Sequence, residues 1–252
     1  MMRDYAHTYH VFRTMKQYFV VADVHSFYDE MMTALAEQGY DPANPDHVFV
    51  SLGDLLDRGT QPIQCLDFVN ALAPSRKILV RGNHEDLLEE CLAKKKFLLR
   101  DMHNGTEDTV IRLAGMAAGE FYQGDYHARI AAVRQDARLR KYLSDLVDYA
   151  EIGRYVLVHG WIPAEEDWRA GDWAHARWDN GMQCWYNGYF LKGRTIVCGH
   201  WHTSWGHAYI DNHGTEFGVN ADFSPFAHEG ILAIDACTAH THRVNCVVLT
   251  AP

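Results

Sequence analysis

An apolar run, Val48-Phe49-Val50-Ser51-Leu52, passes directly into a charged turn, Gly53-Asp54-Leu55-Leu56-Asp57-Arg58-Gly59. A continuous apolar run that stops abruptly is typical of a buried strand in a parallel sheet. Two other runs have this form: residues 18–22 stop at Asp23, and residues 77–80 lead into Arg81-Gly82-Asn83-His84-Glu85. The first third of the chain therefore predicts three parallel strands.

The spacing of the polar residues supports this arrangement. His25 and Asp54 are 29 positions apart, and Asp54 and Asn83 are again 29 apart, close to the ~30 residues of one strand–helix–strand unit. Stretches 27–38 and 62–72 carry apolar residues at helical spacing. Because parallel strands gather ligands at their carboxyl ends, we expect these polar residues to meet at one edge of the sheet.

The rest of the chain predicts a second sheet. Residues 86–150 have helical periodicity and are interpreted as a helical insertion over the site. Two later runs, 154–158 and 194–198, read as strands that deliver His159 and His200. Antiparallel strands are expected in the tail at 206–210, 216–219, 230–235 and 244–249. We therefore expect an α/β (or α+β) fold, two sheets face to face with helices outside, in a single domain over residues 1–252.

Composition excludes several classes of function. The formal charge of −10 over 252 residues argues against nucleic-acid binding and against an anionic membrane surface. No apolar stretch approaches the ~20 residues of a membrane span. Residues 1–16 lack the apolar centre of a secretory signal, so we expect a cytoplasmic protein. The six cysteines form no C-x-x-C pair, which argues against a thiolate zinc site.

The polar segments supply ligands for two metal ions. Carboxylate, carboxamide and imidazole donors suit hard or borderline divalent metals, and one carboxylate can bridge two ions about 3.5–4 Å apart. The predicted ligands of the first ion are Asp23, His25 and Asp54, with His202 as a further imidazole. Those of the second ion are Asp54, Asn83, His159 and His200.

Other residues beside these ligands suit phosphoryl transfer. Arg58 and Arg81 match the charge on phosphoryl oxygens with paired donors. His84 adjoins Asn83 and is predicted to protonate the leaving oxygen, while Asp57 holds its ring in the correct tautomer.

Together the ordered DxH, GDxxDRG, RGNHE, HG and GHxH segments resemble the calcineurin-like metallophosphoesterases, especially the phosphoprotein phosphatase branch and its bacterial and phage relatives. The resemblance runs from about residue 17 to 203 and implies a four-layer αββα fold, hydrolysis of phosphomonoesters, and two Mn, Fe or Zn ions. It places the bridging aspartate on Asp54, the general acid on His84 and the phosphate-binding residues on Arg58, Arg81 and Asn83. A further phosphate-binding arginine is expected at Arg177, with Arg169 as the next candidate.

The sequence leaves several alternatives open. The DxH histidine is followed by Ser26 rather than the usual glycine, and the phosphatase branch commonly lacks a ligand where His202 stands. An aromatic cluster in residues 168–190 suits either packing or a substrate pocket, with Trp178 the candidate for substrate contact. The leading function is a serine/threonine phosphatase acting on a phosphoprotein or a small phosphoester. A dinucleoside polyphosphate hydrolase and an inactive scaffold are the alternatives.

Overall fold

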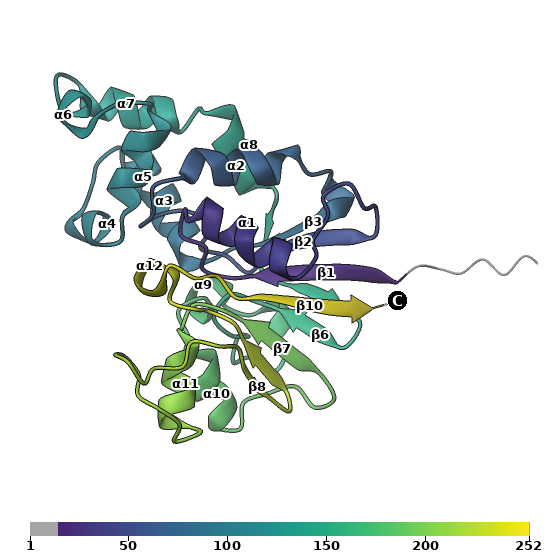
Figure 1. Cartoon of the computed structure of the whole chain (residues 1–252). Helices are drawn as coiled ribbons and strands as arrows, with labels where there is room; N and C mark the ends of the chain where they lie inside the picture. The colour runs from purple at the N-terminus through teal and green to yellow at the C-terminus, as the bar shows by residue number, and fades with distance from the viewer. Residues whose placement is uncertain (1–14, 252) are drawn as a thin grey trace, which may run out of the picture.

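The computed structural model describes residues 15–251, and two five-stranded sheets form its centre (Figure 1). The first sheet has the order β10-β1-β2-β3-β4. Its strands are β1 (Lys16–Val21), β2 (His47–Ser51), β3 (Lys77–Val80), β4 (Leu146–Val147) and β10 (Cys246–Ala251). Strands β1 to β4 are parallel and β10 is antiparallel to β1. The three parallel strands expected from the first third of the chain are confirmed.

The second sheet has the order β5-β6-β7-β9-β8. Its strands are β5 (Ala150–Ile152), β6 (Tyr155–Leu157), β7 (Thr195–Cys198), β8 (Phe226–His228) and β9 (Ile231–Ala233). Strands β6, β7 and β9 are parallel, and the outer two are antiparallel to their neighbours. The strands predicted before His159 and His200 are therefore present.

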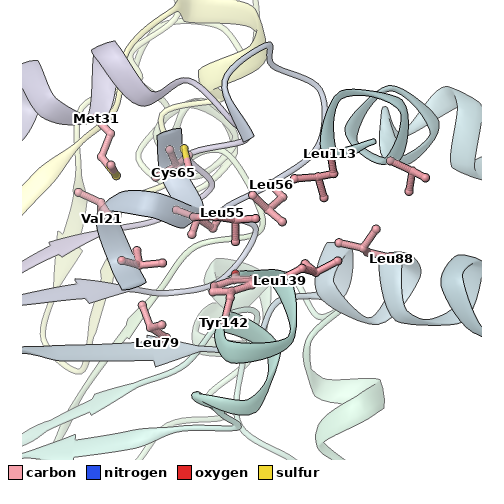
Figure 2. Close-up of a cluster of buried hydrophobic side chains, with 14 of the residues drawn as sticks. Val21, Met31, Leu55, Leu56, Cys65, Leu79, Leu88, Leu113, Leu139 and Tyr142 are labelled. Carbon is pink, nitrogen blue, oxygen red and sulfur yellow. The ribbon is translucent and has the colours of Figure 1, made fainter. Parts of the chain in front are cut away.

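Three buried clusters define the four layers. Val20 and Val50 of the first sheet pack against Leu157 and Val197 of the second, between the two sheets. The outer face of the first sheet packs against helices, as Figure 2 shows for Val21, Leu79 and Tyr142 among others. Trp161, Met182 and their neighbours fill the corresponding space under the second sheet. The expected αββα fold is confirmed.

Helices cover both outer faces. On the outer side of the first sheet lie α1 (Tyr28–Glu37), α2 (Pro62–Ala71), α3 (Asn83–Lys94) and α8 (Ala137–Ser144). Four more helices extend this layer beyond the strands and pack against α2, α3 and one another (Figure 1): α4 (Leu99–His103), α5 (Thr106–Leu113), α6 (Ala118–Phe121) and α7 (Tyr126–Val133). The second sheet carries α9 (Trp173–Ala176), α10 (Gly181–Tyr186) and α11 (Thr203–Tyr209), and α12 (Thr238–Thr241) precedes β10. Among the described residues, no helix combines the length and apolar character needed to cross a bilayer.

The tail differs from the sequence prediction. Residues 206–210 lie mostly in helix α11 rather than in a strand, and no strand forms at 216–219. Gly206 lets this helix pack closely on α10, because a Cβ there would lie 2.4 Å from Met182 Sδ. Strand β9 pairs parallel to β7, whereas an antiparallel tail was expected. The sequence did not predict three short strands. Two of them, β4 and β5, lie at the end of the stretch expected to be helical, and the third is β8. The absence of a secretory signal was argued for residues 1–16, of which residues 1–14 lie outside the described part.

Candidate metal centre

The site is built where parallel strands end. After β1 come Asp23 and His25, after β2 comes Asp54, and after β3 comes Asn83. The second sheet contributes His159 after β6 and His200 after β7. These loops surround one cavity of about 300 Å³. The structure thus brings six of the predicted ligands to one edge of the sandwich.

Asp54 lies between two groups of imidazoles. Its Oδ1 is 3.4 Å from His159 Nε2, and its Oδ2 is 3.9 Å from His25 Nε2. Two sets of side chains have ligand atoms close enough to share an ion: His25, Asp54 and His84, and Asp54, His159 and His200. Because Asp54 belongs to both sets with a different oxygen facing each, it has the orientation of a bridging carboxylate.

Three imidazoles are oriented by backbone carbonyls. His25 Nδ1 donates to Leu56 O at 3.1 Å, His159 Nδ1 donates to Leu52 O at 2.7 Å, and His200 Nε2 donates to Trp178 O at 3.2 Å. A carbonyl oxygen only accepts, so each contact fixes the tautomer and leaves the other ring nitrogen for a ligand. Metal-binding histidines are usually held in this way. The donor set and its orientation therefore fit metal ions.

His84 has different partners. Its Nδ1 lies 2.9 Å from Asp57 Oδ2, and its Nε2 lies 3.2 Å from Nη2 of Arg58. Asp57 Oδ2 also accepts a 2.6 Å hydrogen bond from Thr106 in α5. Burial lowers the pKa of His84, but Asp54 and the Asp57 hydrogen bond outweigh it and raise this pKa above its ordinary value. A carboxylate-held imidazole with a raised pKa is suited to carry a proton at the site.

Glycines allow the loops to approach each other. A Cβ at Gly82 would lie 2.1 Å from Asp54 Oδ1, and one at Gly199 would lie 2.2 Å from Asp23 Oδ2. These contacts are shorter than any side chain tolerates. Each glycine therefore leaves room for the carboxylate of a neighbouring loop, in addition to allowing its own turn.

Backbone strain is concentrated in the same loops. Among residues 15–251, eleven non-glycine residues have positive φ, and seven of them lie in these loops: Asp23, His25, Ser26, Asp54, Asp57, Arg58 and His200. Left-handed backbone at such residues costs about 1–3 kcal/mol each and persists only where the surrounding structure enforces it. Ser26, which replaces the usual glycine, adopts φ 60° and so keeps a glycine-like turn.

A family model described as calcineurin-like phosphoesterase matches residues 17–243. The chain belongs to the calcineurin-like phosphoesterase family. Serine/threonine-protein phosphatase 1 of Salmonella typhimurium is 33% identical over 93 residues, 37% of this chain and 41% of the relative. The asymmetrical bis(5'-nucleosyl)-tetraphosphatase PrpE of Bacillus velezensis is 29% identical over 156 residues, 59% of this chain and 58% of the relative. The matches thus span less than two thirds of each relative.

Solved structures show the same fold. A protein described provisionally as a diadenosine tetraphosphatase superimposes with a TM-score of 0.58 at 12% identity, covering 95% of this chain and 96% of that one. A protein serine/threonine phosphatase from Saccharomyces cerevisiae gives a TM-score of 0.51 at 16% identity, with 94% and 74% covered. At these identities the likeness concerns architecture alone.

Glu85 and Tyr142 support the ligand loops from below. The sequence did not assign either residue to the site. Glu85 accepts from the backbone N–H groups of Asp54 (2.9 Å), Leu55 (3.0 Å) and Gly82 (2.8 Å). It also accepts from the Tyr142 hydroxyl at 2.7 Å. Glu85 therefore ties the loops of Asp54 and Gly82 together. Nothing in the sequence signals Tyr142.

Asp235 was also missed. It follows β9 as Asp23 follows β1, so the apolar run before it was the available signal. Burial raises its pKa to about 6. Burial, and next the nearby Asp235, raise the pKa of Asp23 well above its ordinary value. Two carboxyl groups buried in one cavity repel each other, and a bound cation is the group that offsets this repulsion.

The predicted phosphate-binding arginines have different surroundings. Arg58 lines the cavity beside His84. Arg81 pairs with Asp86 at 3.2 Å and with Glu89, and Arg177 pairs with Asp86 at 2.7 Å and with Asp148. Neither guanidinium lines the cavity. Phosphate binding by Arg81 or Arg177 stays a prediction that requires these ion pairs to open.

Two further candidates differ in position. His202 lines the cavity, with its Nδ1 2.9 Å from Ser204 Oγ and its Nε2 3.4 Å from Glu216. Metal ligation by His202 stays a prediction, and it requires Nε2 to exchange Glu216 for the ion. Arg169 pairs with Glu151 at 2.8 Å and packs over Trp168 on the outer face of the second sheet. It lies away from the cavity lining.

Proposed function

We propose that this phosphoesterase hydrolyses phosphate esters at a two-metal centre. The proposed ligands are Asp23, His25, Asp54, Asn83, His159 and His200. The observation that supports this most directly is the orientation of Asp54, whose two oxygens face different imidazole groups. His202 also lines the cavity and is the proposed further imidazole for the first ion.

Two bound metal ions would supply Lewis acidity to the phosphoryl oxygens and to the attacking water. Side chains of the protein would bind the phosphate and move the proton. Arg58 lines the cavity and offers charged donors to the phosphate, which suits the charge that develops in phosphoryl transfer. His84 delivers a proton to the leaving oxygen, and Asp57 with Thr106 keeps its ring in place.

Two substrate classes suit this chemistry. One is phosphoserine or phosphothreonine in a protein or small phosphoester, as the name of the Salmonella relative suggests. The other is a dinucleoside polyphosphate, named for the Bacillus relative and for the symmetrical enzyme of Pasteurella multocida. The metal ligands act on phosphate alone, so residues around the cavity must choose between the two.

The metal centre is tested by reconstitution. Protein loaded with Mn²⁺, Fe or Zn²⁺ should bind close to two ions per chain and hydrolyse p-nitrophenyl phosphate. Asp54→Asn should lose at least one ion and most of the activity, because the amide offers a single oxygen. Full turnover by the Asp54→Asn protein at unchanged metal content would contradict the proposal.

Substrate class is tested with the loaded enzyme. Parallel assays compare a phosphoserine peptide with diadenosine tetraphosphate at equal concentrations. The ratio of the two kcat/KM values identifies the preferred class. Activity on neither, with p-nitrophenyl phosphate still hydrolysed, would reject both candidates and keep only the general phosphoesterase.

A further inference from the structure

The mouth of the cavity carries two exposed indole rings. Trp178 is 49% exposed and Trp201 is 36% exposed, and both line the cavity that contains Asp54, Asn83 and His84. The other five tryptophans, all within the described residues, are buried or half-buried. A large apolar ring kept open to solvent beside a polar site needs a reason other than packing.

Both rings are fixed relative to the proposed metal ligands. Trp178 lies edge-on to His200 with ring centroids 5.9 Å apart, and Trp201 lies edge-on to the same ring at 6.0 Å. The carbonyl of Trp178 accepts the hydrogen bond from His200 Nε2. Trp178 follows helix α9, and its backbone N–H donates to His175 O at 2.9 Å. The backbone of Trp178 thus orients a proposed ligand, and both indole rings lie against that ligand's imidazole.

The cavity is lined by polar groups and by the two indoles. In the proposed function Arg58, Asn83 and His84 serve the phosphate and the leaving oxygen, while the exposed indoles offer flat apolar surface beside them. A serine or threonine ester presents little to such a surface. A leaving group with a flat aromatic ring can stack on an indole, an interaction that is tolerant of ring identity.

We infer that Trp178 and Trp201 select phosphate esters or anhydrides whose leaving group carries a flat aromatic ring, either a nucleobase or a phenyl ring. This rests on the proposed function, because the phosphate must sit at the metal end for the ring to reach the mouth. The two indoles are specificity residues and take no part in the proton transfer. Among the two substrate classes above, this favours the nucleotide.

The test uses the metal-loaded full chain with Trp178→Leu, Trp201→Leu and the double variant. Substrates are diadenosine tetraphosphate, phenyl phosphate and glycerol 2-phosphate, which lacks a ring. Each single change should raise KM about tenfold for at least one of the two substrates that carry a ring, diadenosine tetraphosphate and phenyl phosphate. This equals about 1.4 kcal/mol of binding. The KM for glycerol 2-phosphate should stay unchanged. Phe190→Leu is the control, because Phe190 is also 49% exposed but does not line this cavity.

The pattern across substrates decides the outcome. A loss confined to diadenosine tetraphosphate supports the inference with a nucleobase as the ring, and a loss confined to phenyl phosphate supports it with a phenyl ring. Equal changes for all three esters, or none, overturn it.

A binding measurement separates this inference from the proposed function. Quenching of tryptophan fluorescence by AMP should exceed that by glycerol phosphate and should weaken in both leucine variants, even in a preparation without turnover. Equal quenching by the two ligands, or quenching that both variants retain, overturns the inference whatever the activity.

Discussion

The hydroxyl of Tyr142 donates a 2.7 Å hydrogen bond to Glu85, and both side chains are buried. Glu85 uses its other acceptor positions for the backbone of the Asp54 and Gly82 loops. Tyr142 belongs to α8, so this bond links the helical segment after β3 to the ligand loops. Helix α8 therefore supports the site as well as the core, to which Tyr142 also belongs (Figure 2).

Tyr142→Phe should lower the free energy of unfolding by about 1–3 kcal/mol, because the buried carboxylate of Glu85 loses one hydrogen bond and its Oε1 keeps only the Leu55 N–H. It should also weaken metal binding, since Glu85 positions the Asp54 loop. Urea unfolding and a metal titration measure the two effects. A matched control is Tyr122→Phe, whose hydroxyl bonds to Glu107 at the surface, and it should change neither quantity appreciably. Unchanged stability of Tyr142→Phe would contradict the role given to this bond.

Asp57→Asn should lower kcat by roughly 100-fold for an alkyl phosphate, because His84 loses the carboxylate that holds its protonated ring. The loss should be much smaller for p-nitrophenyl phosphate, whose leaving group needs little protonation. Thr106→Val removes the 2.6 Å donor to Asp57 and should show the same pattern more weakly. An equal loss on both esters would point to a structural role for Asp57 instead.

Gly199→Ala should displace Asp23 and lower metal occupancy, because the added Cβ would lie 2.2 Å from Asp23 Oδ2. Overpacking of this kind costs typically about 1–3 kcal/mol. Gly119→Ala is the matched control, since nothing lies within 4 Å of its Cβ position and it is inside helix α6. Elemental analysis gives the ions per chain. Two ions retained in Gly199→Ala would show that the close approach is not needed for the site.

Asp136 caps helix α8 by accepting from the backbone N–H groups of Arg138 (2.8 Å) and Leu139 (3.2 Å). Asp136→Ala should lower the free energy of unfolding by about 1 kcal/mol, while Asp136→Asn keeps most of the cap. The hydrogen bond from Arg138 lowers the pKa of Asp136. A lowered folded-state pKa adds stability above the ordinary value near 4, and this stability is lost as the pH falls through the folded-state value. The difference in the free energy of unfolding between the unmodified protein and Asp136→Asn should therefore be smaller at pH 3 than at pH 7, as measured by denaturant curves.

The sequence predicted the ends of strands β1, β2 and β3 in the first sheet. Each apolar run before Asp23, Asp54 and Asn83 became a strand, because burial on both faces requires a continuous apolar segment and the following turn must be polar. The same logic placed His159 and His200. Asp235 follows the same rule after β9, and it was missed only because its run was read as part of an antiparallel tail.

Tertiary structure alone decided the partners of these segments. Residues 206–209 lie in a helix that packs closely on Met182 at Gly206, and no local pattern encodes that contact. Arg81 and Arg177 pair with Asp86, although the sequence suggested phosphate as their partner. Tyr142 and Glu85 meet across 57 positions of sequence. Local periodicity predicted the buried parallel strands, whereas which side chains share a buried space depends on how the layers pack, and that is a property of the whole chain.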